Sequence, residues 1–265
     1  RKNFKTCTPN YIPSYSRMGQ TTSTTTTNSA TTSSSSVTSL GIKIVMISDT
    51  HGHHRDVNIP DGDVLIHGGD WTQHGKLEDA LDFNTWLGEI KSKFQHIIVV
   101  NGNHESNATW KHETHSILSN AIFLKNETTR IDVVVKKAGG TTITEESTTN
   151  VHTVTVHGTE FYWSMRYDDE PRPEYDAIPN NTQILIAHNP PKGVCDGKTP
   201  TGCPALRRRL DELSNVGSTN LRLLVCGHIH KAHGTDVVNG VTIVNAANAD
   251  KGHGDMGHPA TVFEL

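Results

Sequence analysis

Residues 42–52 read IKIVMISDTHG, a short apolar run that ends directly in a group of polar side chains. The run Ile42–Ile47 is rich in β-branched residues, which is typical of a strand buried on both faces. The residues that follow, Asp49-Thr50-His51-Gly52, place a carboxylate and an imidazole just beyond it. We therefore predict a buried strand whose carboxyl end carries chemically active side chains.

Four further apolar runs have the same form. They are Val64–Ile66, Ile97–Val100, Ile184–Ala187 and Leu221–Cys226. The polar stretches that follow them are Gly69-Asp70, Gly102-Asn103-His104-Glu105, His188-Asn189-Pro190-Pro191 and Gly227-His228-Ile229-His230. Because ligands bind beyond the carboxyl ends of the strands in open α/β sheets, we expect the five polar stretches to converge in space.

Helical patterns lie between these strands. Lys76–Lys91 carries apolar residues at helical spacing, and Pro204–Leu213 follows a Gly-Cys-Pro break. Strands that alternate with helices imply a layered α/β fold.

Two other regions are typical of hairpins. Arg130–Lys136 and Val151–Val156 alternate like exposed strands and flank a polar segment, 138–150, which we expect to be an inserted loop. Asn239-Gly240 predicts a two-residue hairpin between strands 237–238 and 241–244. The last strand is expected over 261–265.

The first 40 residues differ in composition from the rest. Between Thr21 and Ser39 nearly every residue is Thr or Ser, which leaves too little apolar surface to offset the entropy of ordering. We expect residues 1–40 to be a disordered tail and residues 41–265 to form one domain. The tail is basic and acid-poor, as in transit peptides, and Met18-Gly19 opens an N-myristoylation pattern. A tail without either signal is the third interpretation.

Composition and charge narrow the function classes. The net charge of −4 argues against bulk electrostatic binding to nucleic acid or anionic membranes. No apolar run reaches the roughly 18 residues that span a bilayer. The four cysteines show no paired C-x-x-C spacing, so we expect free thiols in a reducing compartment, which favours a cytoplasmic location. The 17 histidines, several beside Asp, Asn and Gly, point to metal chemistry.

The five polar stretches offer one consistent set of ligands. Imidazole, carboxylate and neutral amide oxygen together suit Mn, Fe or Zn better than Ca. One such stretch alone occurs often by chance, and a single histidine after a strand is more often a hydrogen-bonding residue than a ligand. Five of them in this order after five strand-like runs indicate a metal centre.

The same residues resemble a known family. Asp49-x-His51, Gly69-Asp70, Gly102-Asn103-His104-Glu105, His188 and Gly227-His228-x-His230 are similar to the motifs of calcineurin-like metallophosphoesterases, over roughly residues 42–265. The stretches after His188 and Gly227 look most like the metallophosphoesterase-domain-containing, brain-type branch. The resemblance implies a four-layer α/β fold, in which a β-sandwich is flanked by helices.

The resemblance also implies a role for each matching residue. The ligands of one divalent cation would be Asp49, His51, Asp70 and His230. The ligands of a second would be Asp70, Asn103, His188 and His228. The catalytic residues would be Asp70, which bridges both cations through its two oxygens, and His104, which faces the scissile phosphate. Two such cations (Mn, Fe or Zn, with Mn expected to serve in vitro) generate a bridging hydroxide and clamp the phosphate.

The resulting prediction is a hydrolase that cleaves a small phosphodiester, such as a cyclic nucleotide, without a nucleic-acid partner. Two alternatives stay open: a phosphomonoesterase or phosphoprotein phosphatase, and a non-catalytic nucleotide-binding scaffold. Phosphoprotein phosphatases carry Gly-Asp-x-x-Asp-Arg-Gly and Arg-Gly-Asn-His-Glu, and this chain has His74 and Asn101 in place of the two arginines. The complete ligand set argues against the scaffold. Residues 162–164 depart from the Gly-Ser-Pro-Trp of the brain-type branch, which puts the substrate contacts there in doubt.

Several residues near the motifs have open roles. Glu105 is expected either to orient a ligating imidazole or to cap the local backbone. Among the additional histidines, His233 is the one expected to contact phosphate or base. The others are interpreted as solvent-exposed or packing residues: His53, His54, His67, His74, His253 and His258.

Overall fold

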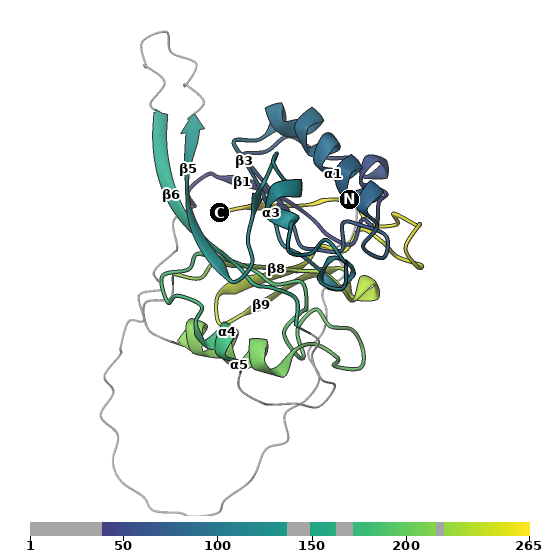
Figure 1. The fold of residues 1–265 in the computed structure, drawn as a ribbon. Coiled ribbons are helices and arrows are strands. Elements are labelled where there is room, and N and C mark those ends of the chain that lie inside the picture. Colours follow the sequence, from purple (N-terminus) through teal and green to yellow (C-terminus); the bar gives the residue numbers. More distant parts are fainter. Residues whose placement is uncertain (1–38, 137–148, 163–171, 216–219) are drawn as a thin grey trace, which may run out of the picture.

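The computed structural model describes residues 39–136, 149–162, 172–215 and 220–265 of the chain (Figure 1). Nearly all of the expected tail, the possible acylation site at Gly19 and most of the expected loop over 138–150 lie outside the described residues. The described chain is already attached to the fold at residue 40, because the Leu40 N–H donates to the carbonyl of Leu265. Among the described residues, α1 is the longest helix at 14 residues, and none is long and apolar enough to cross a membrane.

The first of two sheets has five strands in the order β11-β1-β2-β3-β4. Their bounds are β1 Lys43–Ile47, β2 Val64–His67, β3 His96–Val99, β4 Ile122–Phe123 and β11 Thr261–Glu264. Strands β1 to β4 are parallel, and β11 is antiparallel to β1. The carboxyl ends of β1, β2 and β3 therefore lie at one edge of the sheet.

The second sheet has six strands in the order β5-β6-β7-β8-β10-β9. Their bounds are β5 Glu127–Lys136, β6 Thr149–Gly158, β7 Ile184–Ile186, β8 Leu223–Cys226, β9 Gly234–Val238 and β10 Val241–Asn245. Strands β6, β7, β8 and β10 are parallel, whereas β5 and β9 pair antiparallel with β6 and β10. The long β5–β6 hairpin projects from the body of the molecule (Figure 1).

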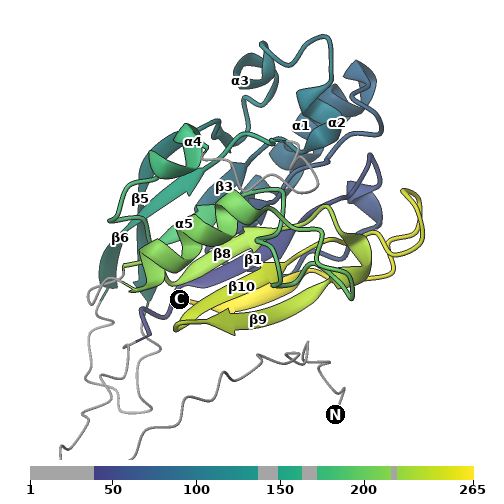
Figure 2. The same cartoon turned by 90° about the horizontal axis from the view of Figure 1, so that it is seen from below.

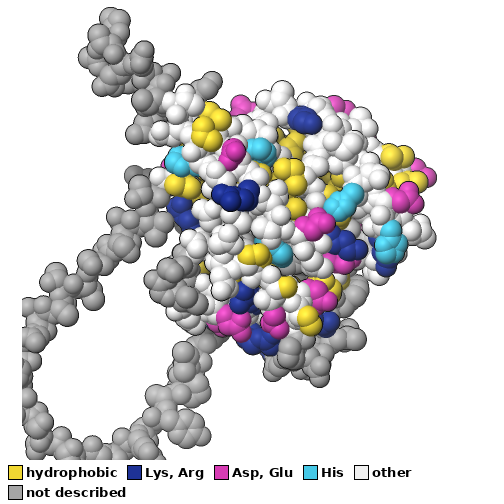
Figure 3. Space-filling view, turned by 60° about the vertical axis from the view of Figure 1, so that its left-hand side comes forward, with side chains coloured by type: hydrophobic (Ala, Val, Ile, Leu, Met, Phe, Trp, Pro, Cys, Tyr) yellow, Lys and Arg dark blue, Asp and Glu magenta, His cyan; other side chains and the backbone are white. Residues whose placement is uncertain are grey.

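Helices cover the outer sides of the two sheets (Figure 2). The α-helices are α1 Leu77–Ile90, α2 Asn103–Ser106, α3 Thr114–Ile117, α4 Pro173–Asp176 and α5 Pro204–Asn215. Three 3₁₀ turns complete the set: η1 His54–Asp56, η2 Lys91–Lys93 and η3 His230–Ala232. Helix α1 packs on the five-stranded sheet and α5 on the six-stranded sheet. On the face shown in Figure 3, acidic and basic side chains are interspersed rather than gathered into a patch of one sign.

The uninterrupted apolar runs are explained by burial on both faces of each strand. In β1, Ile44 and Met46 belong to the core between the sheets, which also contains Val156 of β6. The alternate residues Val45 and Ile47 belong to the second core beneath α1. Since every position of these four is buried, hydrophobic burial stabilises the strand from both sides. The predicted four-layer arrangement is confirmed.

The boundaries of the predicted elements need small corrections. Strand β6 begins at Thr149, so the last two residues of the expected loop belong to a strand. The hairpin over β5 and β6 is not exposed on both faces, because Val133 and Val156 are fully buried in the core between the sheets. The hairpin at Asn239-Gly240 is present, and both residues have positive φ, as such a turn requires. Strand β4 was not predicted, since two residues carry no readable period.

Candidate metal centre

The polar stretches after β1, β2, β3, β7 and β8 meet in the structure. The nearest approach of Asp70 after β2 to His188 after β7 is 3.3 Å, between Oδ2 and Nε2. Asp49 after β1 lies 3.3 Å from His230 after β8, between Oδ1 and Nε2. Each of these pairs joins one sheet to the other, so the candidate centre sits where the carboxyl ends of both sheets come together.

The predicted ligands fall into two adjacent groups. The ligand atoms of the first group, Asp49, His51 and His230, lie within 4.8 Å of one another, and so do those of the second, Asp70, His188 and His228. The amide oxygen of Asn103 adjoins the second group, 2.8 Å from Nδ1 of His228. All seven residues that the sequence pointed to are therefore in one place.

Backbone strain is concentrated at these residues. Outside glycine, φ is positive at Asp49 (55°), His51 (46°), Asp70 (54°) and His228 (66°). A residue with a side chain loses roughly 1–2 kcal/mol in this conformation, and such strain persists where a site requires it.

Two glycines of the motifs leave room for the carboxylates. A Cβ at Gly227 would overlap a carboxylate oxygen of Asp49, and a Cβ at Gly102 would overlap Oδ1 of Asp70. The carboxylates then accept backbone N–H groups from the same region: His228 N–H donates to Asp49 at 3.0 Å, and His104 N–H donates to Oδ1 of Asp70 at 2.9 Å. Each motif thus orients a side chain of another motif.

Glu105 caps the backbone and does not orient an imidazole. Its fully buried carboxylate accepts the N–H groups of Asp70, Thr72 and Gly102 at 2.8–2.9 Å, and also the Thr72 hydroxyl at 2.7 Å. Burial and the nearby Asp70 raise the pKa of Glu105 to about 7. Of the two roles considered for Glu105, the structure supports the second. The imidazole of His188 is oriented by a backbone carbonyl instead, since its Nδ1 donates to Gly68 at 2.8 Å.

Electrostatic coupling keeps both carboxylates ionised. Burial by itself raises the pKa of Asp49, but the charges of His188 and His230 lower it well below its ordinary value. For Asp70 the same opposition, with His188 as the main partner, gives a pKa of about 2. Burial disfavours a charged His188, yet Asp70 and Asp49 raise its pKa to about 9. The two carboxylates therefore favour a positive charge between them. In the metal-free protein the imidazolium of His188 supplies that charge.

Two further imidazoles of the centre, those of His51 and His228, are held neutral by burial. Burial lowers the pKa of His51 to about 3 and that of His228 to about 4. A neutral imidazole is the form that binds a metal ion. Nδ1 of His51 is also buried without a hydrogen-bond partner among the described residues. Carboxylates, neutral imidazoles and this unsatisfied ring nitrogen form a donor set that fits Mn, Fe or Zn.

His104 is positioned by the backbone on one side and faces the carboxylates on the other. Its Nδ1 lies 3.0 Å from the Thr72 carbonyl and 2.9 Å from the His74 N–H. The opposite ring nitrogen, Nε2, lies 3.9 Å from Oδ2 of Asp70. One ring nitrogen of His104 is therefore left for a molecule bound beside the two groups.

The structure places His253, rather than His233, among the imidazoles of the centre. Nδ1 of His233 contacts the Ala247 carbonyl, and its ring stacks on His258 at 4.4 Å. The ring of His253 instead stacks on His51 at 4.2 Å between centroids. Sequence reasoning missed it because His253 lies in a loop with no motif around it. At the other side of the centre, the ring of Phe161 adjoins His188 and His228, while 163–164 lie outside the described residues.

Comparisons with known proteins agree with this geometry. The model of the calcineurin-like phosphoesterase family matches residues 42–232. A UPF0046 protein of Caenorhabditis elegans is 31% identical over 84% of this chain and 75% of its own length. Human metallophosphoesterase domain-containing protein 1 is 30% identical over 77% of this chain and 65% of its own length. A second UPF0046 protein of the worm is 26% identical over 79% and 76% of the two chains. The family match spans the strands and loops that carry all seven candidate ligands, and the chain belongs to the calcineurin-like phosphoesterase family.

Proposed function

We propose that this protein is a dinuclear metal-dependent phosphodiesterase that hydrolyses a small phosphodiester, such as a cyclic nucleotide. The observation that supports it best is the pair of adjacent groups, Asp49/His51/His230 and Asp70/His188/His228, beside the free ring nitrogen of His104. In this proposal each group, with Asn103 added to the second, holds one divalent cation. When bound, the cations supply Lewis-acid activation of water and neutralise phosphate charge.

The residues of the chain then have distinct tasks. Oδ1 of Asp70 accepts the His104 N–H and Oδ2 lies 3.3 Å from His188, so Asp70 is held beside both groups and would be a ligand of both cations. This contact also fixes the distance of His104 from the centre. The Nε2 atom of His104 would donate to a phosphate oxygen or to the leaving oxygen.

We propose a diester substrate because of the charge that the site has to neutralise. A phosphomonoester dianion needs more positive charge than a diester monoanion, and this chain has His74 and Asn101 in place of the two arginines of phosphoprotein phosphatases. Imidazole and amide groups are weaker anion ligands than a bidentate guanidinium. The ring of Phe161 beside His188 offers an apolar contact for an ester substituent.

The test is hydrolysis of bis(p-nitrophenyl) phosphate by chelator-stripped protein that is titrated with Mn²⁺. We expect turnover to return with two equivalents of metal. Asp70→Asn should lower both metal content and turnover, whereas His104→Ala should retain the metal and lose about 10²-fold or more in kcat. The proposal is wrong if the protein takes up two equivalents and hydrolyses p-nitrophenyl phosphate but no diester, or if both variants retain full activity.

A further inference from the structure

The loop that carries His253 is fastened next to the candidate centre. At its base, the His258 N–H donates to the Asn248 carbonyl at 3.0 Å, and the Asp250 N–H donates to the Asp255 carbonyl at 2.9 Å. Asn248 in turn donates its own N–H to the carbonyl of Ser48, the residue before Asp49. Gly252 (φ 82°) and Gly254 flank His253. The loop is thus anchored to the end of β1, and His253 lies between the hydrogen-bonded residues Asp250 and Asp255.

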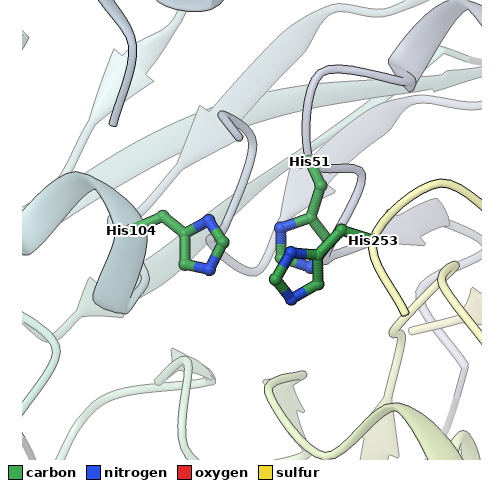
Figure 4. Close-up of side chains that lie close together, drawn as sticks. All are labelled: His51, His104 and His253. Atoms are coloured by element: carbon green, nitrogen blue, oxygen red, sulfur yellow. The ribbon is translucent and has the colours of Figure 1, made fainter. Parts of the chain in front are cut away.

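The ring of His253 lies among the imidazoles of the centre. Figure 4 shows His51, His104 and His253 approaching one another from three separate segments, with ring centroids 4.2 Å from His253 to His51 and 5.0 Å to His104. His74 and His230 follow at 5.2 Å and 6.0 Å. His253 therefore borders the Asp49/His51/His230 group, whereas Phe161 borders the Asp70/His188/His228 group.

A third cation between His51, His104 and His253 is the competing explanation, because one ligand atom of each lies within 4.8 Å of the others. The orientation of the ring planes argues against a third cation. The rings of His51 and His253 are stacked with only 26° between their planes. Imidazole binds a metal along a lone pair in the ring plane, at about 2.0–2.1 Å for zinc. Two stacked rings with centroids 4.2 Å apart do not direct in-plane lone pairs to one such point, so a shared metal ion needs a rotated ring.

A bound phosphate needs no such rotation. Nδ1 of His104 lies against the backbone of Thr72 and His74. When Nδ1 accepts the His74 N–H, the ring proton is on Nε2, which is left to donate to the substrate. One ring nitrogen of His253 lies within 4.8 Å of one of His104, so a phosphate between the two rings is within reach of both. A neutral imidazole carries one N–H donor, so the contact does not require a charged ring.

We propose that His253 is a substrate-contacting residue, whose ring N–H donates to an outer oxygen of the phosphate that His104 also contacts. The assignment rests on the proposed function in that both place a phosphate at this centre. It adds a sixth participating segment, the loop between β10 and β11, to the five motifs after the strands.

The experiment compares His253→Ala, His253→Gln and Lys251→Ala in Mn-loaded protein. Gln retains an N–H donor, and the exposed Lys251 on the same loop controls for altered loop structure. Calorimetric titration with inorganic phosphate should show about tenfold weaker binding for His253→Ala, with most of it restored in His253→Gln and none lost in Lys251→Ala. Metal content per chain should be equal in all four proteins, and KM for bis(p-nitrophenyl) phosphate should rise more than kcat falls.

The outcomes separate the two proposals. Unchanged phosphate affinity in His253→Ala, or no phosphate binding by the Mn-loaded wild type, would overturn the assignment. Loss of one metal equivalent in His253→Ala would also overturn it, in favour of the third cation. If phosphate binding depends on His253 while the wild type hydrolyses no ester, the assignment stands and the proposed phosphodiesterase fails.

Discussion

At the scale of single residues, the carboxylates of the centre also hold the backbone in place. Asp49 accepts the N–H of His228, Asp70 accepts that of His104, and Glu105 accepts three N–H groups. These contacts stabilise a backbone with several positive φ values. Residues that the sequence marks as chemical are therefore also structural, and their substitution affects folding as well as activity.

Glu105 provides the sharpest test of this dual role. Glu105→Ala leaves three buried N–H groups and the Thr72 hydroxyl without their acceptor, at roughly 1–3 kcal/mol for each unsatisfied group. We expect the free energy of unfolding, measured in urea, to fall by about 3 kcal/mol or more. Glu113→Ala, at an exposed position, should change it by less than about 0.5 kcal/mol. Equal stability of the two variants would contradict the capping role.

At the scale of elements, helix α5 has one face packed on the six-stranded sheet and the other face exposed to solvent. Leu206, Leu210 and Leu213 are buried against the outer side of the six-stranded sheet. Arg207 and Arg208 lie on the exposed side, where they pair with Asp211 and Asp176. The helix is therefore held by apolar burial, and its surface ion pairs contribute little.

Substitutions on the two sides of α5 should differ accordingly. Leu210 is fully buried, so Leu210→Ala is expected to lower the free energy of unfolding by about 2–5 kcal/mol. Arg208→Ala should cost no more than about 1 kcal/mol. Urea unfolding measures both, and metal content should stay the same in each, since α5 supplies no candidate ligand. If Arg208→Ala lowers the free energy of unfolding more than Leu210→Ala does, the helix is held mainly by its ion pairs and not by apolar burial.

At the scale of the whole molecule, the candidate centre joins the two sheets. Asp70 and Asp49 follow strands of the five-stranded sheet, whereas His188 and His230 follow strands of the other. A cation held by residues of both sheets binds only when the sheets are correctly packed. Metal binding should therefore stabilise the entire domain rather than one loop.

Thermal unfolding with and without metal measures this coupling. At a free Mn²⁺ concentration about 100 times the dissociation constant, one bound ion contributes about 2.7 kcal/mol, which corresponds to roughly 5–10 °C in Tm for a domain of this size. Asp70→Asn should abolish most of the shift. An equal shift in wild type and variant would show that the ion binds elsewhere.

The raised pKa of His188 gives the metal-free protein a defined pH dependence. Its pKa is about 9 in the fold and 6.5 as the ordinary value, so the stabilisation by the imidazolium is complete below about pH 6.5 and is lost as the pH rises through about 9. Metal uptake must displace this proton, so the apparent metal affinity should rise with pH over the same interval. We expect Tm of the metal-free protein to fall, and proton release on Mn²⁺ binding to shrink, between pH 7 and pH 9.5. A Tm that rises over this interval would contradict the assignment.

Local sequence determined much of this protein. Runs such as Ile42–Ile47 predict strands that are buried on both faces. The polar stretches after such runs identify Asp49, Asp70 and His188 as candidate site residues, even when the order of the strands in the sheets is not known. These predictions succeed because a buried strand and the functional residues at its carboxyl end are adjacent in the sequence. The order of those stretches also carried the resemblance to the family.

Tertiary structure alone decided the rest. Glu105 could have served an imidazole or the backbone, and only the fold brings the N–H groups of Asp70 and Thr72 to it. His253 is one histidine among many until the loop closure and the pairing of Asn248 with Ser48 set it beside His51. The physical reason is the same in both cases: these contacts join residues far apart in the chain, and no local period or spacing encodes which distant groups a buried carboxylate or a loop imidazole will meet.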